Sequence, residues 1–91
     1  MDKTYYLVGS CWYSGDQGDF PNNFHFPTFI SESLEEAERM YEEKAKEDDT
    51  WGYGCKSAYL ISYHDGKYKM IRGYKNQILD LVNITFTEGG E

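Results

Sequence analysis

The chain has 91 residues, 40% of them hydrophobic and 18% aromatic, and a formal net charge of −7 at neutral pH. This length fits one domain with a single core, and the apolar content excludes a disordered acidic tail. The excess of acid argues against direct binding to nucleic acid or to anionic membranes, because both depend on basic groups.

Residues 1–87 are expected to form one domain, and residues 88–91 a disordered tail. The N-terminus lacks the basic and apolar regions of a signal peptide, and no apolar run approaches the ~20 residues of a membrane span. We therefore expect a cytoplasmic protein. In a reducing compartment Cys11 and Cys55 are expected to be thiols.

Residues 4–13 are rich in aromatic and β-branched side chains and predict a strand. Both faces of this strand are apolar, with Leu7 and Tyr13 on one and Val8 and Trp12 on the other, so both faces need cover. Four of the five phenylalanines and both prolines of the chain lie in the next segment, 14–30. The phenylalanines there are expected to supply cover, and the competing interpretation is an exposed aromatic binding loop.

Ser33 and Glu36 have the spacing of a helix capping box. After them an apolar stripe recurs at three- and four-residue steps, which predicts an amphipathic helix with a narrow buried face. The stripe consists of Leu34, Ala37, Tyr41 and Ala45.

The predicted helix also carries most of the acid in the chain. Nine of the sixteen acidic residues lie between Glu32 and Asp49, against three bases, which leaves a local charge of −6. Glu47, Asp48 and Asp49 would lie at the C-terminal end of the helix, where its dipole favours cations.

Asp65-Gly66 is a strong signal for a two-residue hairpin turn between strands at 57–64 and 67–73. The turn fixes the register, so His64 faces Lys67 and Ile61 faces Met70. Continued to the open end, this register places Leu60 opposite Ile71 in an apolar patch. That patch, or a sheet edge, offers a surface for a symmetric dimer.

The region 76–82 fits either a helical turn or a strand, because its apolar residues satisfy both periods. We expect a short turn or helix followed by a final strand near 81–87. The predicted architecture is a small α+β domain in which one acidic amphipathic helix packs on an antiparallel sheet of three to five strands.

The sequence contains no motif for catalysis, metal binding or a cofactor. Histidines and cysteines are scattered, with no CxxC or HxxxH spacing, and no glycine-rich phosphate loop is present. We therefore expect a binding protein and no enzyme.

The first functional hypothesis is a small acidic inhibitor that docks on a basic, nucleic-acid-binding protein. A helix with this density of acids resembles the charge spacing of duplex DNA, so the target would be a nuclease, a restriction enzyme or a CRISPR-type effector, as in phage anti-defence. The predicted contact residues are Glu32, Glu35, Glu36, Glu42, Glu43, Glu47, Asp48 and Asp49.

The alternative is a module that binds or sequesters a small ligand such as a nucleotide. Surplus aromatic side chains would stack on a ring and nearby bases would hold a phosphate. The predicted residues for this role are Trp12, Tyr13, Trp51, Tyr53, Lys67, Lys69 and Arg72.

Overall fold

The computed structural model describes residues 3–14, 21–47, 49–51, 54–73, 78–82 and 84–88. Within these residues the chain forms seven strands and one helix. In chain order they are β1 (Thr4–Ser14), β2 (Pro21–Asn22), β3 (Phe29–Ser31), α1 (Leu34–Ala45), β4 (Asp49–Trp51), β5 (Gly54–His64), β6 (Lys67–Arg72) and β7 (Leu79–Leu81).

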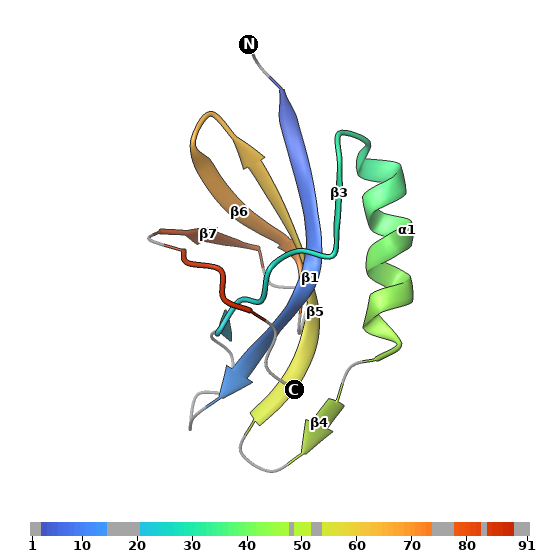
Figure 1. Ribbon diagram of the computed structural model, residues 1–91, viewed down its shortest axis with the longest axis vertical. Helices are drawn as coiled ribbons and strands as arrows, with labels where there is room; N and C mark the ends of the chain where they lie inside the picture. Colours follow the sequence, from blue (N-terminus) through green and yellow to red (C-terminus); the bar gives the residue numbers. More distant parts are fainter. Residues whose placement is uncertain are drawn as a thin grey trace.

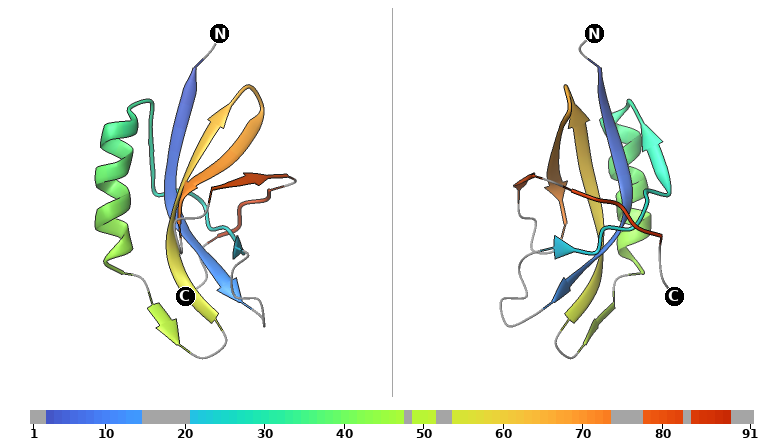
Figure 2. Two further views of the ribbon diagram at one scale, coloured as in Figure 1. Left: turned by 180° about the vertical axis from the view of Figure 1, so that it is seen from behind. Right: turned by 60° about the vertical axis from the view of Figure 1, so that its left-hand side comes forward.

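The strands form one antiparallel sheet in the order β2-β1-β5-β6-β7, with β3 added to β1 and β4 added to β5. Helix α1 packs across β1 and β5 on one face of this sheet, and the C-terminal segment crosses the other face (Figures 1 and 2). We call these the helix side and the tail side. The predicted α+β architecture, one helix on an antiparallel sheet, is confirmed.

Each face of the sheet has its own core, because alternate residues of β1 and β5 point to opposite sides. The helix-side core consists of Val8, Ala37, Tyr41, Ala58 and Leu60. The tail-side core consists of Leu7, Cys11, Tyr13, Phe24, Tyr59, Ile61 and Met70. The expectation that both faces of the first strand need cover is therefore confirmed. The side chain of Cys55 lies outside the described part of the chain.

Aromatic rings supply most of the cover on the tail side. The Phe86 ring lies 5.8–6.5 Å from the rings of Phe24, Phe26, Tyr59 and Tyr68. Backbone hydrogen bonds fix this segment, since the Thr87 N–H donates to the Phe24 carbonyl at 2.8 Å. The predicted cover by phenylalanines thus holds for Phe24, which is 8% exposed, while Phe26 remains 55% exposed.

Helix α1 begins as predicted, with the Ser33 hydroxyl accepting the Glu36 N–H at 3.2 Å. The other half of the box differs, because the Ser33 N–H donates to Ser31 Oγ and the Ser31 hydroxyl donates to Glu36. The helix ends at Ala45, within the acid-rich region. Glu47 lies two residues beyond this end, and Lys44 in the last turn pairs with it at 3.5 Å, which offsets part of the predicted opposition between terminal acids and the helix dipole.

The β5–β6 hairpin has the predicted turn and register up to Ile61–Met70. Asp65 and Gly66 have φ values of 53° and 75°, which define the type I′ turn that such hairpins favour. Beyond Ile61 the prediction was wrong, because a bulge pairs Leu60 with Arg72. Leu60 is fully buried beneath α1, so the predicted Leu60/Ile71 surface patch for a dimer does not form.

The C-terminal strand lies earlier than predicted. Strand β7 spans Leu79–Leu81 and pairs with β6. Residues 84–88 cross the tail side with one isolated bridge, between His25 and Thr87. Both leucines of β7 pack against the tail-side core, which selects strand over helix at this position. Of the predicted tail 88–91, residues 89–91 lie outside the described residues.

Candidate functional site

The outer side of α1 displays most of the predicted acidic contact residues. Ala37 and Tyr41 face the sheet and are buried, so the opposite side of the helix is directed into solvent. The exposed acids on and beside the helix are Glu32, Glu35, Glu36, Glu42, Glu43 and Glu47. Of the remaining two predicted residues, Asp48 lies outside the described residues, and Asp49 opens β4 with its side chain also outside them.

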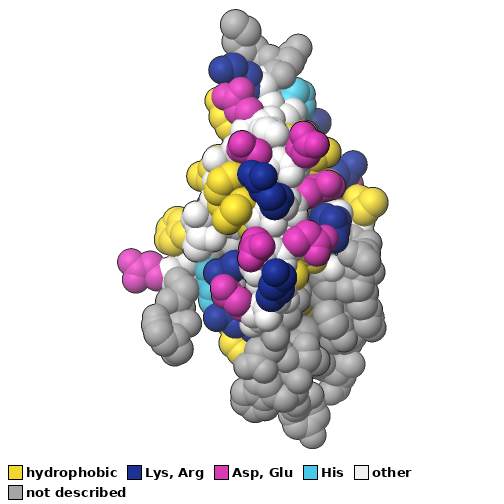
Figure 3. Space-filling model, turned by 90° about the vertical axis from the view of Figure 1, so that its right-hand side faces the viewer, with side chains coloured by type: hydrophobic (Ala, Val, Ile, Leu, Met, Phe, Trp, Pro, Cys, Tyr) yellow, Lys and Arg dark blue, Asp and Glu magenta, His cyan; other side chains and the backbone are white. Residues whose placement is uncertain are grey.

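Basic side chains divide this acidic surface. Figure 3 shows acidic and basic groups alternating over α1. Within the described part of the chain, four ion pairs join them: Lys3–Glu32 at 3.5 Å, Lys44–Glu47 at 3.5 Å, Lys46–Glu43 at 3.7 Å and Arg72–Glu42 at 2.9 Å. The fold thus lowers the local negative charge that the sequence alone suggests, since Lys3 and Arg72 come from outside the acidic stretch.

Within α1, the described acids that have no basic partner lie in the N-terminal half of the helix. Among the described residues, Glu35 and Glu38 make no ion pair, and Glu36 bonds to the Ser31 hydroxyl and not to a base. Exposed pairs of the kind made by Glu43 and Glu47 are worth at most about 1 kcal/mol. A cationic partner can therefore displace their lysines at little cost.

Arg72 links the sheet to the helix. Its guanidinium donates to Glu42 at 2.9 Å and lies 4.6 Å from the centre of the Tyr41 ring. A charge-assisted hydrogen bond and a cation–π contact thus converge on one side chain. Arg72, which was predicted to hold a ligand phosphate, is already engaged by α1.

The two described aromatic side chains of the predicted ligand site, Trp12 and Tyr13, do not lie together. Tyr13 is fully buried in the tail-side core, where its hydroxyl donates to Met70 Sδ at 3.4 Å. Trp12 points to the other face of the sheet, because the two are consecutive in β1. Only the backbone of Trp51 is described, in β4, and Tyr53 lies outside the described residues.

The lysines of that predicted site, Lys67 and Lys69, lie far from Tyr13. Lys67 pairs with His64, which pairs with Thr4 at the opposite end of β1 from Tyr13. Nine residues of strand correspond to about 30 Å. Lys69 is exposed on β6 two residues further along. No single small ligand spans Tyr13 and Lys67.

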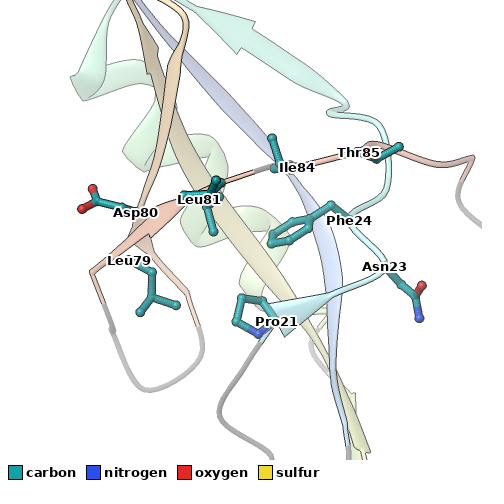
Figure 4. A pocket seen from close by; sticks show the side chains of 9 residues that line it. Pro21, Asn23, Phe24, Leu79, Asp80, Leu81, Ile84 and Thr85 are labelled. Carbon is teal, nitrogen blue, oxygen red and sulfur yellow. The ribbon is translucent and has the colours of Figure 1, made fainter.

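A cavity that the sequence did not indicate lies on the tail side, between β2 and β7 (Figure 4). Its volume is about 480 Å³. It is lined by Pro21, Asn23, Phe24, Leu79, Asp80, Leu81, Val82, Ile84 and Thr85. The two walls are more than fifty residues apart in the sequence, so only the folded sheet joins them. In the sequence, Pro21 and the two leucines Leu79 and Leu81 are apolar residues that could line a site, but no pattern indicates that they lie close together.

Two titratable side chains, Tyr59 and His64, make contacts within the fold. The Tyr59 hydroxyl donates to the His25 carbonyl at 2.6 Å, and burial, with a smaller effect of the adjacent Cys11, raises the pKa of Tyr59. His64 Nδ1 lies 3.1 Å from Thr4 Oγ1 at the end of the sheet. In the described part of the chain, no three residues of the metal-binding types are grouped as ligands.

Comparisons with known proteins give no family assignment. No protein-family model, curated protein or solved structure matches this chain. Among the described residues, no helix has the length and apolar character needed to cross a membrane.

Proposed function

We propose that this protein is a small acidic binding protein that docks the outer side of α1 on a basic surface of another protein. The observation that carries the proposal is the exposure of Glu35, Glu36, Glu43 and Glu47 on the solvent side of a helix whose other side is fully occupied. Because α1 forms a layer of its own, a partner can reach this side without rearranging the sheet (Figure 2).

The more specific form of the proposal is an inhibitor that occupies a nucleic-acid-binding surface. Carboxylates on α1 would take positions that phosphates normally fill on a nuclease, a restriction enzyme or a CRISPR-type effector, as a phage anti-defence protein would do. The alternation of acids and bases in Figure 3 favours a short contact over the mimicry of a long duplex. The N-terminal half of α1, where Glu35 and Glu38 lack basic partners among the described residues, would form its centre.

Affinity capture from a nuclease-treated host lysate tests the proposal. Wild type is compared with a Glu35→Lys/Glu43→Lys variant, which reverses two exposed charges and leaves the Ser33 cap intact. A basic partner should be retained by wild type and lost by the variant, with affinity at least about tenfold lower, because like charges then face each other. Binding should also weaken as salt is raised.

The matched control is Asp80→Lys/Glu88→Lys. This variant also replaces two acids by two lysines, so its change in net charge equals that of the α1 variant. Both residues are exposed and lie away from α1. Retention of the partner by this control, together with its loss from the α1 variant, would locate the contact on the helix. Equal retention by all three proteins would refute the proposal. For the more specific form, duplex DNA should compete with this protein for the captured partner.

A further inference from the structure

The cavity between β2 and β7 has walls of mainly apolar side chains. Figure 4 shows Phe24 and Leu81 projecting from opposite walls toward the space between them, with Pro21 and Leu79 at the same end. Phe24 is held edge-on against Tyr59, with ring centres 5.7 Å apart, so this wall is supported by the tail-side core. The volume of about 480 Å³ falls within the range of small-molecule sites, roughly 300–1,000 Å³.

Val82 is the most exposed large hydrophobic residue among those described, at 79%. It lines this cavity and also a neighbouring one of about 440 Å³, which reaches Lys67 and Tyr68. An aliphatic side chain left in water between two hollows lacks the favourable free energy that its burial would give. A ligand in the cavity would recover part of that energy.

The charges of the lining select the kind of ligand. Asp80 is the one charged residue among the described residues that line the cavity between β2 and β7. Leu79 and Leu81 point into the tail-side core, so strand alternation turns Asp80 to the other face, beside its pairing partner Lys69. Figure 4 shows the Asp80 carboxylate directed away from the cavity. A charged ligand would lose its hydration there without a compensating charge.

We infer that this cavity is a binding site for an uncharged, largely apolar small molecule. Asn23 and Thr85 complete its lining, and in Figure 4 the Asn23 amide is directed outward, away from Phe24. Among the described residues that line this cavity there is no cation to hold a phosphate, so the lining favours an uncharged ligand over a nucleotide. It shares no residue with the outer side of α1, so either proposal can fail while the other stands.

Two fluorescent probes with a common skeleton test the inference. N-phenyl-1-naphthylamine is uncharged, and 8-anilinonaphthalene-1-sulfonate is the same skeleton with one negatively charged sulfonate added. Titrated into the wild-type protein, the uncharged probe should bind with one-to-one stoichiometry and at least about tenfold more tightly than the sulfonate, because only the sulfonate must be desolvated without a partner.

A matched pair of variants locates the probe. Val82→Asp places a carboxylate on the cavity wall, whereas Ile78→Asp makes the same change at the other end of β7, at a residue that is 68% exposed and lines neither cavity. Both positions are exposed, so both variants should remain folded, which circular dichroism checks. The uncharged probe should bind Ile78→Asp like wild type and Val82→Asp at least about tenfold more weakly.

Three results would overturn the inference. They are no binding of the uncharged probe to wild type, equal affinity of the two variants, and tighter binding of the sulfonate. A fourth result that would overturn the inference comes from sedimentation velocity of the unliganded protein. If wild type dimerises with rising concentration and Val82→Asp does not, the cavity is an interface between two copies of the chain.

Discussion

The close approach of β1 to the Tyr59 ring makes Gly9 a position where a larger side chain would not fit. Gly9 pairs with Tyr59 across β1 and β5. A Cβ atom added at Gly9 would lie 2.5 Å from the Tyr59 hydroxyl oxygen and 2.6 Å from Cζ, well inside van der Waals contact. The ring has little freedom to move, because it is fully buried and its hydroxyl donates to the His25 carbonyl at 2.6 Å.

Gly9→Ala should therefore destabilise the protein by about 2–3 kcal/mol. Overpacking of a core costs roughly 1–3 kcal/mol and the stretched hydrogen bond roughly 1 kcal/mol. Replacing glycine by alanine within a strand by itself stabilises the folded state by roughly 0.5–1 kcal/mol, which offsets part of this cost. For a domain of this size the net change corresponds to a melting temperature lower by roughly 10–20 °C.

Urea and thermal unfolding, followed by far-ultraviolet circular dichroism, measure this cost. The control is the same substitution in a Tyr59→Phe background. That background lacks the hydroxyl oxygen nearest to the added Cβ atom, and it has no hydroxyl hydrogen bond to lose. There the cost of Gly9→Ala should fall to about half. An unchanged cost in that background, or a change in wild type below about 0.5 kcal/mol, would contradict the packing seen between these strands.

Three further changes probe the helix and the core. Arg72→Ala should lower the free energy of unfolding by about 1–2 kcal/mol in urea titrations, because it removes an ion pair and a cation–π contact, whereas Glu42→Gln should cost under about 1 kcal/mol. Ser33→Ala should cost about 1 kcal/mol by thermal melting, and Ser33→Asp should largely retain the cap. Burial raises the pKa of Tyr59 above its ordinary value of 10.0, so the folded state keeps a proton that the unfolded state releases. The resulting stabilisation is complete below pH 10 and is lost as the pH rises above it, so wild type should lose up to about 1.4 kcal/mol per pH unit more than Tyr59→Phe.

Features that depend on neighbours in the sequence were predicted well. The Ser33 cap, the buried stripe of α1 and the Asp65-Gly66 turn each follow from residues within a few positions of one another. The two apolar faces of β1 also followed from alternation alone, and they required a cover on each side of the sheet. These local patterns sufficed for the α+β architecture.

Features that depend on the fold as a whole were missed. The bulge that pairs Leu60 with Arg72 has no local signal in the sequence. Pairing of Leu60 with the apolar Ile71 was equally compatible with the pattern of the strand. The position of β7 was decided by the leucines that reach the tail-side core, and periodicity left helix and strand equally open there. Ion pairs such as Arg72–Glu42 join residues thirty positions apart. The charge of α1 was therefore overestimated from the sequence.

The two-sided sheet explains why the binding surfaces proposed here lie apart. A central strand that is apolar on both faces must be covered twice, and this chain uses a complete helix on one side and short irregular segments on the other. A helix satisfies the hydrogen bonds of its own backbone, so its outer side is left to charged groups, and this is the side that we propose for a partner. Irregular segments fill a face less completely than a helix, and the space left between β2 and β7 is the cavity that we assign to an apolar ligand. Charge reversal on α1 and the Val82→Asp change therefore act on opposite layers, separated by the buried side chains of β1 and β5.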